Sequence, residues 1–223
     1  MVEMICVKII DDKHTVKFRI IESGDFEQTV DLCSQLFVNK EPITKSLKIN
    51  YQEFRQLAAP YCRKAIQDRL SIVATNAQGQ IVGFIISEPL MTIPPYIQEI
   101  SHKFEPIKTF IDELKYSYYL GRYQYYWELF RTLHIIFLGV KEEYKNQKVA
   151  TNLIKENLKL AKLNYFSLAI SEVTGLKSQN VFRTIGFQEE VTFRYDSYIF
   201  KGEKIFSSIT ESASCKLMSY RIH

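Results

Sequence analysis

A short polar loop, residues 145–150, is the part of this 223-residue sequence best suited to bind an anion. It follows the apolar run at residues 135–140, which predicts a buried strand, and it opens a segment whose apolar residues recur at helical spacing. The first backbone N–H groups of a helix have no partner within the helix, and the helix dipole places partial positive charge at the same end. A strand, a polar loop and a helix in this order therefore predict a phosphate-binding site.

Further motifs surround this loop. The block LxVxxEYxxxxxAxxLI begins at Leu138, and the block SxxVFxxxGF spans residues 178–187, after a second strand predicted for residues 165–171. The apolar strand IVGF lies upstream at residues 81–84. Together these motifs resemble the GNAT acetyltransferase superfamily. An FxxxEP segment ending at Pro42, a long insertion and TxxxS at residues 174–178 are most similar to its arylalkylamine and dopamine N-acetyltransferase branch.

In that superfamily the corresponding loop reads Arg/Gln-x-x-Gly-x-Gly/Ala, and its amides hold the pyrophosphate of acetyl-CoA. Lys145 stands at the Arg/Gln position, Lys148 at the first glycine and Ala150 at the last small residue. Lys148 is a departure, because glycine lets the backbone approach phosphates closely. Either the loop no longer binds cofactor, or Lys145 and Lys148 add charge to its amides. The resemblance implies acetyl-CoA as co-substrate, bound by Leu138, Gly139, Val140, Lys145, Asn146, Gln147, Lys148, Val149, Ala150, Thr151, Ser178 and Phe182.

Acetyl transfer to an amine requires a base, because an amine with a pKa of about 10.4 is uncharged in only about one molecule in a thousand or fewer at pH 7. The resemblance assigns this role to Glu41, in the segment Asn-Lys-Glu-Pro. The alternative is a solvated carboxylate at a helix end. Glu172 is the second candidate for the base, or else a charge at the rim of the site.

The departing thiolate needs a proton or a hydrogen bond. Many members of the superfamily supply it from a tyrosine, but Phe182 holds that position here. The arylalkylamine branch instead carries two hydroxyl residues, which correspond to Thr174 and Ser178. On one helix turn they would face the same side, and helix capping is their alternative role. The resemblance also implies that a backbone N–H near Gly139 or Val140 meets the oxyanion, where the family's central strands splay apart.

These residues depend for their placement on the predicted fold, an α/β GNAT fold with a mixed, mostly antiparallel sheet flanked by helices. Alternating apolar and polar residues indicate a half-buried strand, and the proline at position 42 ends the first helix. Helices are predicted for residues 26–38 and 51–68, and strands for residues 16–20, 71–75, 80–88, 191–201 and 213–221. Residues 1–15 allow an additional N-terminal strand.

Residues 94–133 form a predicted helical insertion, which Pro106 separates into two pieces. Six of the fourteen tyrosines and the only tryptophan lie within residues 116–127. Aromatic residues at this density usually pack in a core or between helices. The alternative is a wall of the acceptor site, where aromatic faces attract a cationic amine.

The composition, with 46% hydrophobic and 24% charged residues, fits a single globular domain over residues 1–223 and excludes disordered or low-complexity classes. No apolar run approaches the roughly 18 residues that span a bilayer, and no cleavage-site pattern follows Met1. We therefore expect a cytoplasmic protein without a membrane partner. A net charge of +4 without a dense basic stripe does not indicate nucleic acid. No metal-ligand spacing is found, and His134, just before the central strand, is expected to be structural.

The resemblance implies an enzyme, an N-acetyltransferase that moves acetyl from acetyl-CoA to a primary amine by direct attack in a ternary complex. The expected acceptor is a small arylalkylamine-like or polyamine-like molecule. Two alternatives remain open at this stage. A non-catalytic acyl-CoA-binding module is favoured by Lys148 and the missing tyrosine, and a protein N-acetyltransferase would need an open peptide groove. The sequence leaves the identity of the amine and the oligomeric state open.

Overall fold

The computed structural model describes residues 6–11, 14–97, 100–121 and 123–223. Within these residues, eight strands form one sheet in the order β1-β2-β3-β4-β5-β6-β8-β7. Neighbouring strands are antiparallel except β5 and β6, which are parallel. The predicted mixed, mostly antiparallel sheet is confirmed. The strands are β1 (Cys6–Asp11), β2 (His14–Ile20), β3 (Ile72–Thr75), β4 (Ile81–Pro89), β5 (Thr132–Val140), β6 (Leu168–Val173), β7 (Gln188–Arg194) and β8 (Ser214–Arg221).

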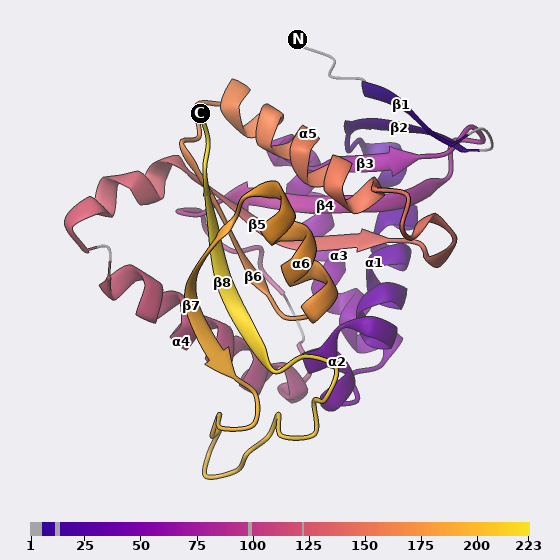
Figure 1. Ribbon diagram of the computed structural model, residues 1–223. Coiled ribbons are helices and arrows are strands. Elements are labelled where there is room, and N and C mark those ends of the chain that lie inside the picture. Colours follow the sequence, from indigo (N-terminus) through magenta and orange to yellow (C-terminus); the bar gives the residue numbers. More distant parts are fainter. Residues whose placement is uncertain (1–5, 12–13, 98–99, 122) are drawn as a thin grey trace.

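Helices cover both faces of the sheet, with α5 and α6 in front of it and α1 and α3 behind it in Figure 1. Alternate residues of one strand serve the two faces, as Ile72 packs in the α5 core and Val73 in the α1/α3 core. The α-helices are α1 (Phe26–Lys40), α2 (Pro42–Ser46), α3 (Tyr51–Asp68), α4 (Glu105–Leu120), α5 (Val149–Leu163) and α6 (Leu176–Ile185). Short 3-10 helices are η1 (Ser23–Asp25), η2 (His102–Phe104), η3 (Tyr123–Arg131) and η4 (Glu142–Tyr144). None of the described helices is long and apolar enough to cross a membrane.

Local capping explains why the second predicted helix is confirmed at both ends. Asn50 accepts a hydrogen bond from the N–H of Glu53, whose side chain accepts one from the N–H of Asn50. This reciprocal pair satisfies two of the unpaired donors at the start of α3. At the other end Arg69 takes a left-handed conformation, with φ of 54° and ψ of 31°, which stops the helix.

The parallel strands β5 and β6 diverge, and we call this place the fork. They pair only from Thr132 opposite Leu168 to His134 opposite Ile170. Both strands then continue, β5 to Val140 and β6 to Val173. The Ser171 hydroxyl donates a hydrogen bond to the carbonyl oxygen of Ile135 at 2.9 Å, just beyond the paired residues. Six residues of β5 therefore run alongside β4 without β6 on their other side.

Some predicted boundaries are wrong. The strand predicted from residue 165 begins at Leu168, because Tyr165 has a φ of 63°, a turn conformation that a strand does not continue. Glu172 consequently lies within β6, and His134 lies within β5 rather than before it. The strand predicted to reach residue 201 ends at Arg194, because Tyr195 and the residues after it turn to bury aromatic rings against α4.

Among the described residues of the insertion, helical structure begins at His102, so the first predicted helical piece is wrong for residues 94–97 and 100–101. Pro106 is the second residue of α4, where its missing N–H costs nothing, and does not separate two helices. The aromatic stretch divides between environments: Tyr118 is 3% exposed in the core, whereas Tyr116 and Trp127 are 63% and 71% exposed. Core packing is thus confirmed for Tyr118 and for Tyr119, which is partly buried against the same cluster, and the side chains of residues 122–126 lie outside the described part.

Candidate active site

The predicted anion loop has the backbone of a glycine-containing loop without the glycine. Asn146 and Lys148 have φ values of 60° and 59°, in the left-handed region, and Lys148 is the N-cap of α5. Holding a side-chain-bearing residue there costs about 1–2 kcal/mol. The first hydrogen bond of the helix runs from the N–H of Asn152 to the carbonyl of Lys148 at 2.9 Å. The N–H groups of Val149, Ala150 and Thr151 precede that bond and have no partner within the helix.

Ion pairs connect this loop to the end of α1. The Glu142 carboxylate pairs with both Lys40 and Lys145. Partial burial, followed by the nearby charges of Lys145 and Lys177, lowers the pKa of Lys40. Three lysines thus gather beside the start of α5, and Glu142 holds the residue before Glu41 close to the loop.

The backbone of β5 presents amides to the fork. The N–H of Lys141 donates to the carbonyl of Val82 on β4 at 2.8 Å. Because successive residues of a strand point their N–H groups to opposite sides, those of Leu138 and Val140 point toward the fork. Gly139 serves packing instead, since a Cβ there would lie 2.5 Å from the Phe84 ring. Of the two residues proposed for the oxyanion, the geometry favours Val140.

Glu41 caps α2 with both carboxylate oxygens. Oε1 accepts from the N–H of Ile43 at 3.1 Å, and Oε2 accepts from the N–H of Thr44 at 2.6 Å. The side chain is half-buried. A carboxylate has about four lone-pair sites, so two backbone bonds leave capacity for a water molecule or an amine. This geometry matches the alternative role considered for Glu41, a carboxylate at a helix end. A catalytic role for Glu41 stays a prediction.

The turn between β6 and α6 faces the Glu41 segment. A Cβ on Gly175 would lie 3.8 Å from the Pro42 ring, so the two segments are in near contact. Thr174 precedes the helix, and its backbone carbonyl accepts a hydrogen bond from the Tyr195 hydroxyl at 2.8 Å. The prediction that Thr174 and Ser178 share one helix turn is therefore wrong. The Ser178 hydroxyl donates to the carbonyl of Gly175 at 2.8 Å, across the first turn of α6.

Phe182, which replaces the tyrosine of many relatives, is a core residue. Its side chain is 2% exposed, and its ring packs edge-on against Phe187 with centroids 4.8 Å apart. Both rings belong to the core beneath α5 and α6. The predicted contact of Phe182 with the cofactor stays a prediction.

A charged row crosses three strands on the sheet face opposite α5; it consists of Glu88, His134 and Glu172. Glu88 and His134 are cross-strand partners on β4 and β5, and their closest charged atoms, Oε1 and Nδ1, are 3.8 Å apart. His134 Nε2 lies 2.7 Å from Glu172 Oε2. Glu172 is 7% exposed at its side chain, so its interpretation as a rim charge is wrong.

The charged row is an ion pair at neutral pH. Burial alone would lower the pKa of His134, but the charge and hydrogen bond of Glu172, with a contribution from Glu88, raise it to about 9. Burial alone would raise the pKa of Glu172, but His134 lowers it. Glu172 is thus a weaker proton acceptor than an ordinary carboxylate, which favours Glu41 as the base.

The charged row was not predicted from the sequence, because its members are far apart in the chain. A signal was present: Glu88 and His134 are the ionisable residues within two otherwise apolar strands. An ionisable residue in a buried strand is rarely tolerated without a partner. The partner of each became identifiable only when the strands were placed side by side.

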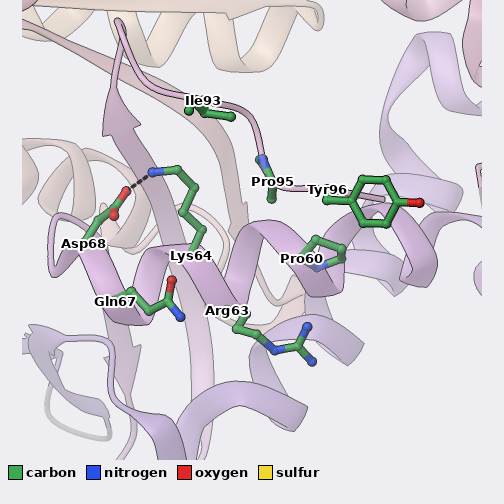
Figure 2. Close-up of a pocket in the computed structure, with 8 residues that line it drawn as sticks. All are labelled: Pro60, Arg63, Lys64, Gln67, Asp68, Ile93, Pro95 and Tyr96. Atoms are coloured by element: carbon green, nitrogen blue, oxygen red, sulfur yellow. Dashed lines mark hydrogen bonds and ion pairs between the residues drawn. The ribbon is translucent and has the colours of Figure 1, made fainter. Parts of the chain in front are cut away.

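A surface hollow of about 340 Å³ lies between α3 and the segment around Pro95 (Figure 2). None of the residues predicted for catalysis or cofactor binding lines it. Its connection to the charged row is Lys64, which pairs with Asp68 and lies 3.8 Å from Glu88 Oε2. Across the described residues, no group of three His, Cys, Asp or Glu side chains could hold a metal ion.

The chain, whose strands β5 and β6 separate beside the start of a helix, matches a known protein family. The model of the Acetyltransferase (GNAT) family matches residues 40–187, more than half of the chain. The chain belongs to this family. It is therefore an acetyltransferase of the GNAT type, a family that uses acetyl-CoA, as the sequence resemblance predicted.

Solved structures share the GNAT fold over nearly the whole chain. Arylalkylamine N-acetyltransferase 2 from Aedes aegypti superposes with a TM-score of 0.78 at 22% identity, covering 93% of this chain and 99% of that one. The C-terminal condensation domain of Ebony, in complex with beta-alanyl-dopamine, superposes with a TM-score of 0.81 at 14% identity, covering 93% of this chain and 99% of that one. Polyamine N-acetyltransferase from Drosophila melanogaster superposes with a TM-score of 0.63 at 15% identity, covering 92% of this chain and 99% of that one. No curated protein sequence matches significantly. The predicted likeness to the arylalkylamine branch is confirmed at the level of the fold.

Proposed function

We propose that this acetyltransferase transfers the acetyl group of acetyl-CoA to the primary amine of a small arylalkylamine-like or polyamine-like molecule, by direct attack in a ternary complex. The observation that carries the proposal is the fork. There, β5 amides without a β6 partner, the start of α5 and the Glu41 segment converge from separate parts of the chain.

The residues around the fork suit acetyl-CoA, which supplies an activated acetyl thioester when bound. The N–H groups of Val149, Ala150 and Thr151 offer donors to the pyrophosphate, in the left-handed loop formed by Asn146 and Lys148. The N–H groups of Leu138 and Val140 offer donors along β5. Lys145 and Lys148 add positive charge beside these donors, which favours an anion.

Each catalytic residue has a defined task in this proposal. Glu41 accepts the proton that the ammonium must lose, directly or through water, and such help is worth about 10²- to 10⁴-fold in rate. The N–H of Val140 donates to the thioester oxygen as negative charge develops on it. The amine nitrogen forms the new C–N bond as the C–S bond breaks. The nitrogen loses a second proton as the amide forms, and the departing thiolate takes up one proton in its place. The hydroxyl of Thr174, or that of Ser178 once it leaves the Gly175 carbonyl, donates a hydrogen bond to the sulfur.

The test is Glu41→Gln, which keeps the shape and one capping oxygen but removes the base. We expect CoA-thiol release to fall by about 10²-fold or more, from the usual contribution of a general base. Acetyl-CoA affinity, measured by calorimetry, should stay nearly unchanged. Glu203→Gln, at an exposed glutamate of the tail, is the matched control and should keep full activity.

The amine panel for this test contains arylalkylamines, polyamines and amino acids, because enzymes of the same fold are named for the first two classes. An unchanged rate in Glu41→Gln would refute the role of Glu41. Tight acetyl-CoA binding without thiol release on any amine would support the acyl-CoA-binding module in place of the small-amine acetyltransferase.

A further inference from the structure

The turn between β6 and α6 is held by side chains that donate to three successive backbone carbonyls. The carbonyls of residues 173–175 accept, in order, from Gln179 Nε2 at 3.1 Å, the Tyr195 hydroxyl at 2.8 Å and the Ser178 hydroxyl at 2.8 Å. Gln179 and Ser178 belong to α6, the helix that the turn begins, whereas Tyr195 reaches the turn from the segment after β7. The backbone of this turn is therefore fixed from its own helix and from a distant part of the chain.

The two hydroxyls proposed to meet the departing sulfur differ in their hydrogen bonds. A hydroxyl carries one proton to donate, and Ser178 already gives its proton to the carbonyl of Gly175. Among the described residues, the side-chain hydroxyl of Thr174 has no hydrogen-bond partner. Its side chain is half-buried. Thr174 is thus the hydroxyl that is free to donate to a ligand, and its backbone is the one that Tyr195 holds.

Tyr195 is itself rigidly placed. Its side chain is 1% exposed, and its ring stacks on Phe110 with centroids 5.8 Å apart and meets Phe206 edge-on at 6.1 Å. Burial, the largest cause, raises the pKa of Tyr195, so the hydroxyl keeps its proton and acts as a donor at neutral pH. A buried phenol with a fixed ring is a precise support for the carbonyl that it contacts.

The segment that carries Tyr195 also contacts the helix that Glu41 caps. Ile43 of α2 packs in the same core cluster as Tyr195. Lys45 of α2 forms an ion pair at 2.7 Å with Glu211, which belongs to the segment between β7 and β8 and lies beside α2 in Figure 1. One segment therefore touches both parts of the proposed reaction site, the part with the base and the part with the hydroxyl.

We propose that Tyr195 is a positioning residue for acetyl transfer, whose hydroxyl fixes the Thr174 backbone so that Thr174, and not Ser178, donates to the departing sulfur. This inference rests on the proposed function, which left that task to either residue. Tyr195 touches neither substrate, and it neither gains nor loses a proton during the reaction.

The first test is Tyr195→Phe, which keeps the ring in its cluster and removes the hydroxyl. We expect kcat for CoA-thiol release to fall about 10- to 100-fold, since a misplacement of about 1 Å can cost about 10²-fold. The KM for acetyl-CoA should stay nearly unchanged. Tyr51→Phe is the matched control, because it removes a phenol hydroxyl that donates to Asp31 at 2.6 Å between α3 and α1, and it should keep the wild-type kcat.

A double-mutant cycle separates positioning from a general loss of stability. Thr174→Val removes the hydroxyl at nearly constant shape and should lower kcat more than Ser178→Ala does. Adding Tyr195→Phe to Thr174→Val should lower kcat no further, because the two residues act through one hydroxyl, whereas adding it to Ser178→Ala should cost its full factor. Thermal unfolding verifies that each variant is folded, and the comparison of Thr174→Val with Ser178→Ala decides the assignment even if Tyr195→Phe does not fold.

Three results would overturn the proposal. They are an unchanged kcat in Tyr195→Phe, a larger loss in Ser178→Ala than in Thr174→Val, and losses that multiply when Tyr195→Phe is added to Thr174→Val. The last result is what a purely structural role of Tyr195 predicts, because independent effects add as free energies.

NMR of protein with labelled threonine methyl groups separates failure of the positioning from failure of the proposed function. The three-bond couplings of the Thr174 methyl group should indicate one rotamer in the wild type and in Tyr51→Phe, and several in Tyr195→Phe. If no amine releases CoA thiol but the couplings change in this way, the positioning of Thr174 stands without the reaction. If Tyr195→Phe leaves the couplings unchanged, the positioning is refuted whatever the activity.

Discussion

Raising the pH should weaken the fold through His134, whose pKa lies at about 9 in the folded protein against an ordinary value of 6.5. A raised folded pKa stabilises the protein fully below the unfolded pKa, and this contribution disappears as the pH rises through the folded value. Each pKa unit corresponds to about 1.36 kcal/mol, so the difference of 2.5 units contributes about 3.4 kcal/mol at low pH. About 2.5 kcal/mol of this should be lost between roughly pH 5.5 and 8.5.

Urea unfolding at pH 5.5, 7.0 and 8.5 measures this loss. The upper limit matters because the buried thiols of Cys33 and Cys215 have raised pKa values, chiefly from burial, and also destabilise the fold once unfolded thiols ionise above about pH 8.5. His134→Gln carries no titrating ring, so the stability difference between the wild type and this variant should shrink by about 2.5 kcal/mol across the range. His102→Gln, at an exposed histidine, should follow the wild-type curve.

A constant difference between wild type and His134→Gln across these pH values would refute the ion pair. The same conclusion would follow if His102→Gln abolished the pH dependence. The measurement isolates the charged row because carboxylates elsewhere in the chain titrate mainly below about pH 5, and they are shared by all three proteins.

Two further predictions concern the backbone around the fork. Lys148→Gly should leave the free energy of unfolding unchanged or raise it by up to about 1 kcal/mol, because glycine accepts the left-handed conformation, whereas Lys145→Gly, at a φ of −63°, should lower it by about 0.5–1 kcal/mol. If urea unfolding showed the same loss of stability for Lys148→Gly and Lys145→Gly, the left-handed conformation of Lys148 would not be a source of strain. Gly139→Ala should destabilise the protein by about 1–3 kcal/mol through overpacking against Phe84, whereas Gly24→Ala meets open space and should change stability little. If thermal unfolding gave the same stability for Gly139→Ala and Gly24→Ala, the backbone of β5 would be able to shift at Gly139 and accommodate the added methyl group.

Local signals in the sequence were sufficient to predict most of the helices and loops near the site. The capping pair at Asn50 and Glu53 fixes the start of α3, and Pro42 ends one helix and begins the next. The family motifs also identified the loop at residues 145–150 and its helix. Each of these features depends on residues within a few positions of one another, so neighbouring side chains and backbone carry the information.

The errors came where distant segments decide the outcome. The strand β8 lies between β6 and β7, and β7 ends early because the chain after it packs against α4. Thr174 was expected on a helix, but α6 begins two residues later, at Leu176. Periodicity alone gives no information on which neighbouring element will compete for a residue at a boundary.

The sequence by itself determined the family, the central strand, the anion loop and the presence of Glu41 beside a helix-breaking proline. Only the tertiary structure decided that β5 and β6 part after His134, and that Glu88, His134 and Glu172 lie side by side. Cross-strand neighbours are set by register, and a shift of one residue would turn a side chain to the opposite face. Register depends on the packing of both faces at once, which is why the charged row is a property of the folded sheet and cannot be read from any one strand.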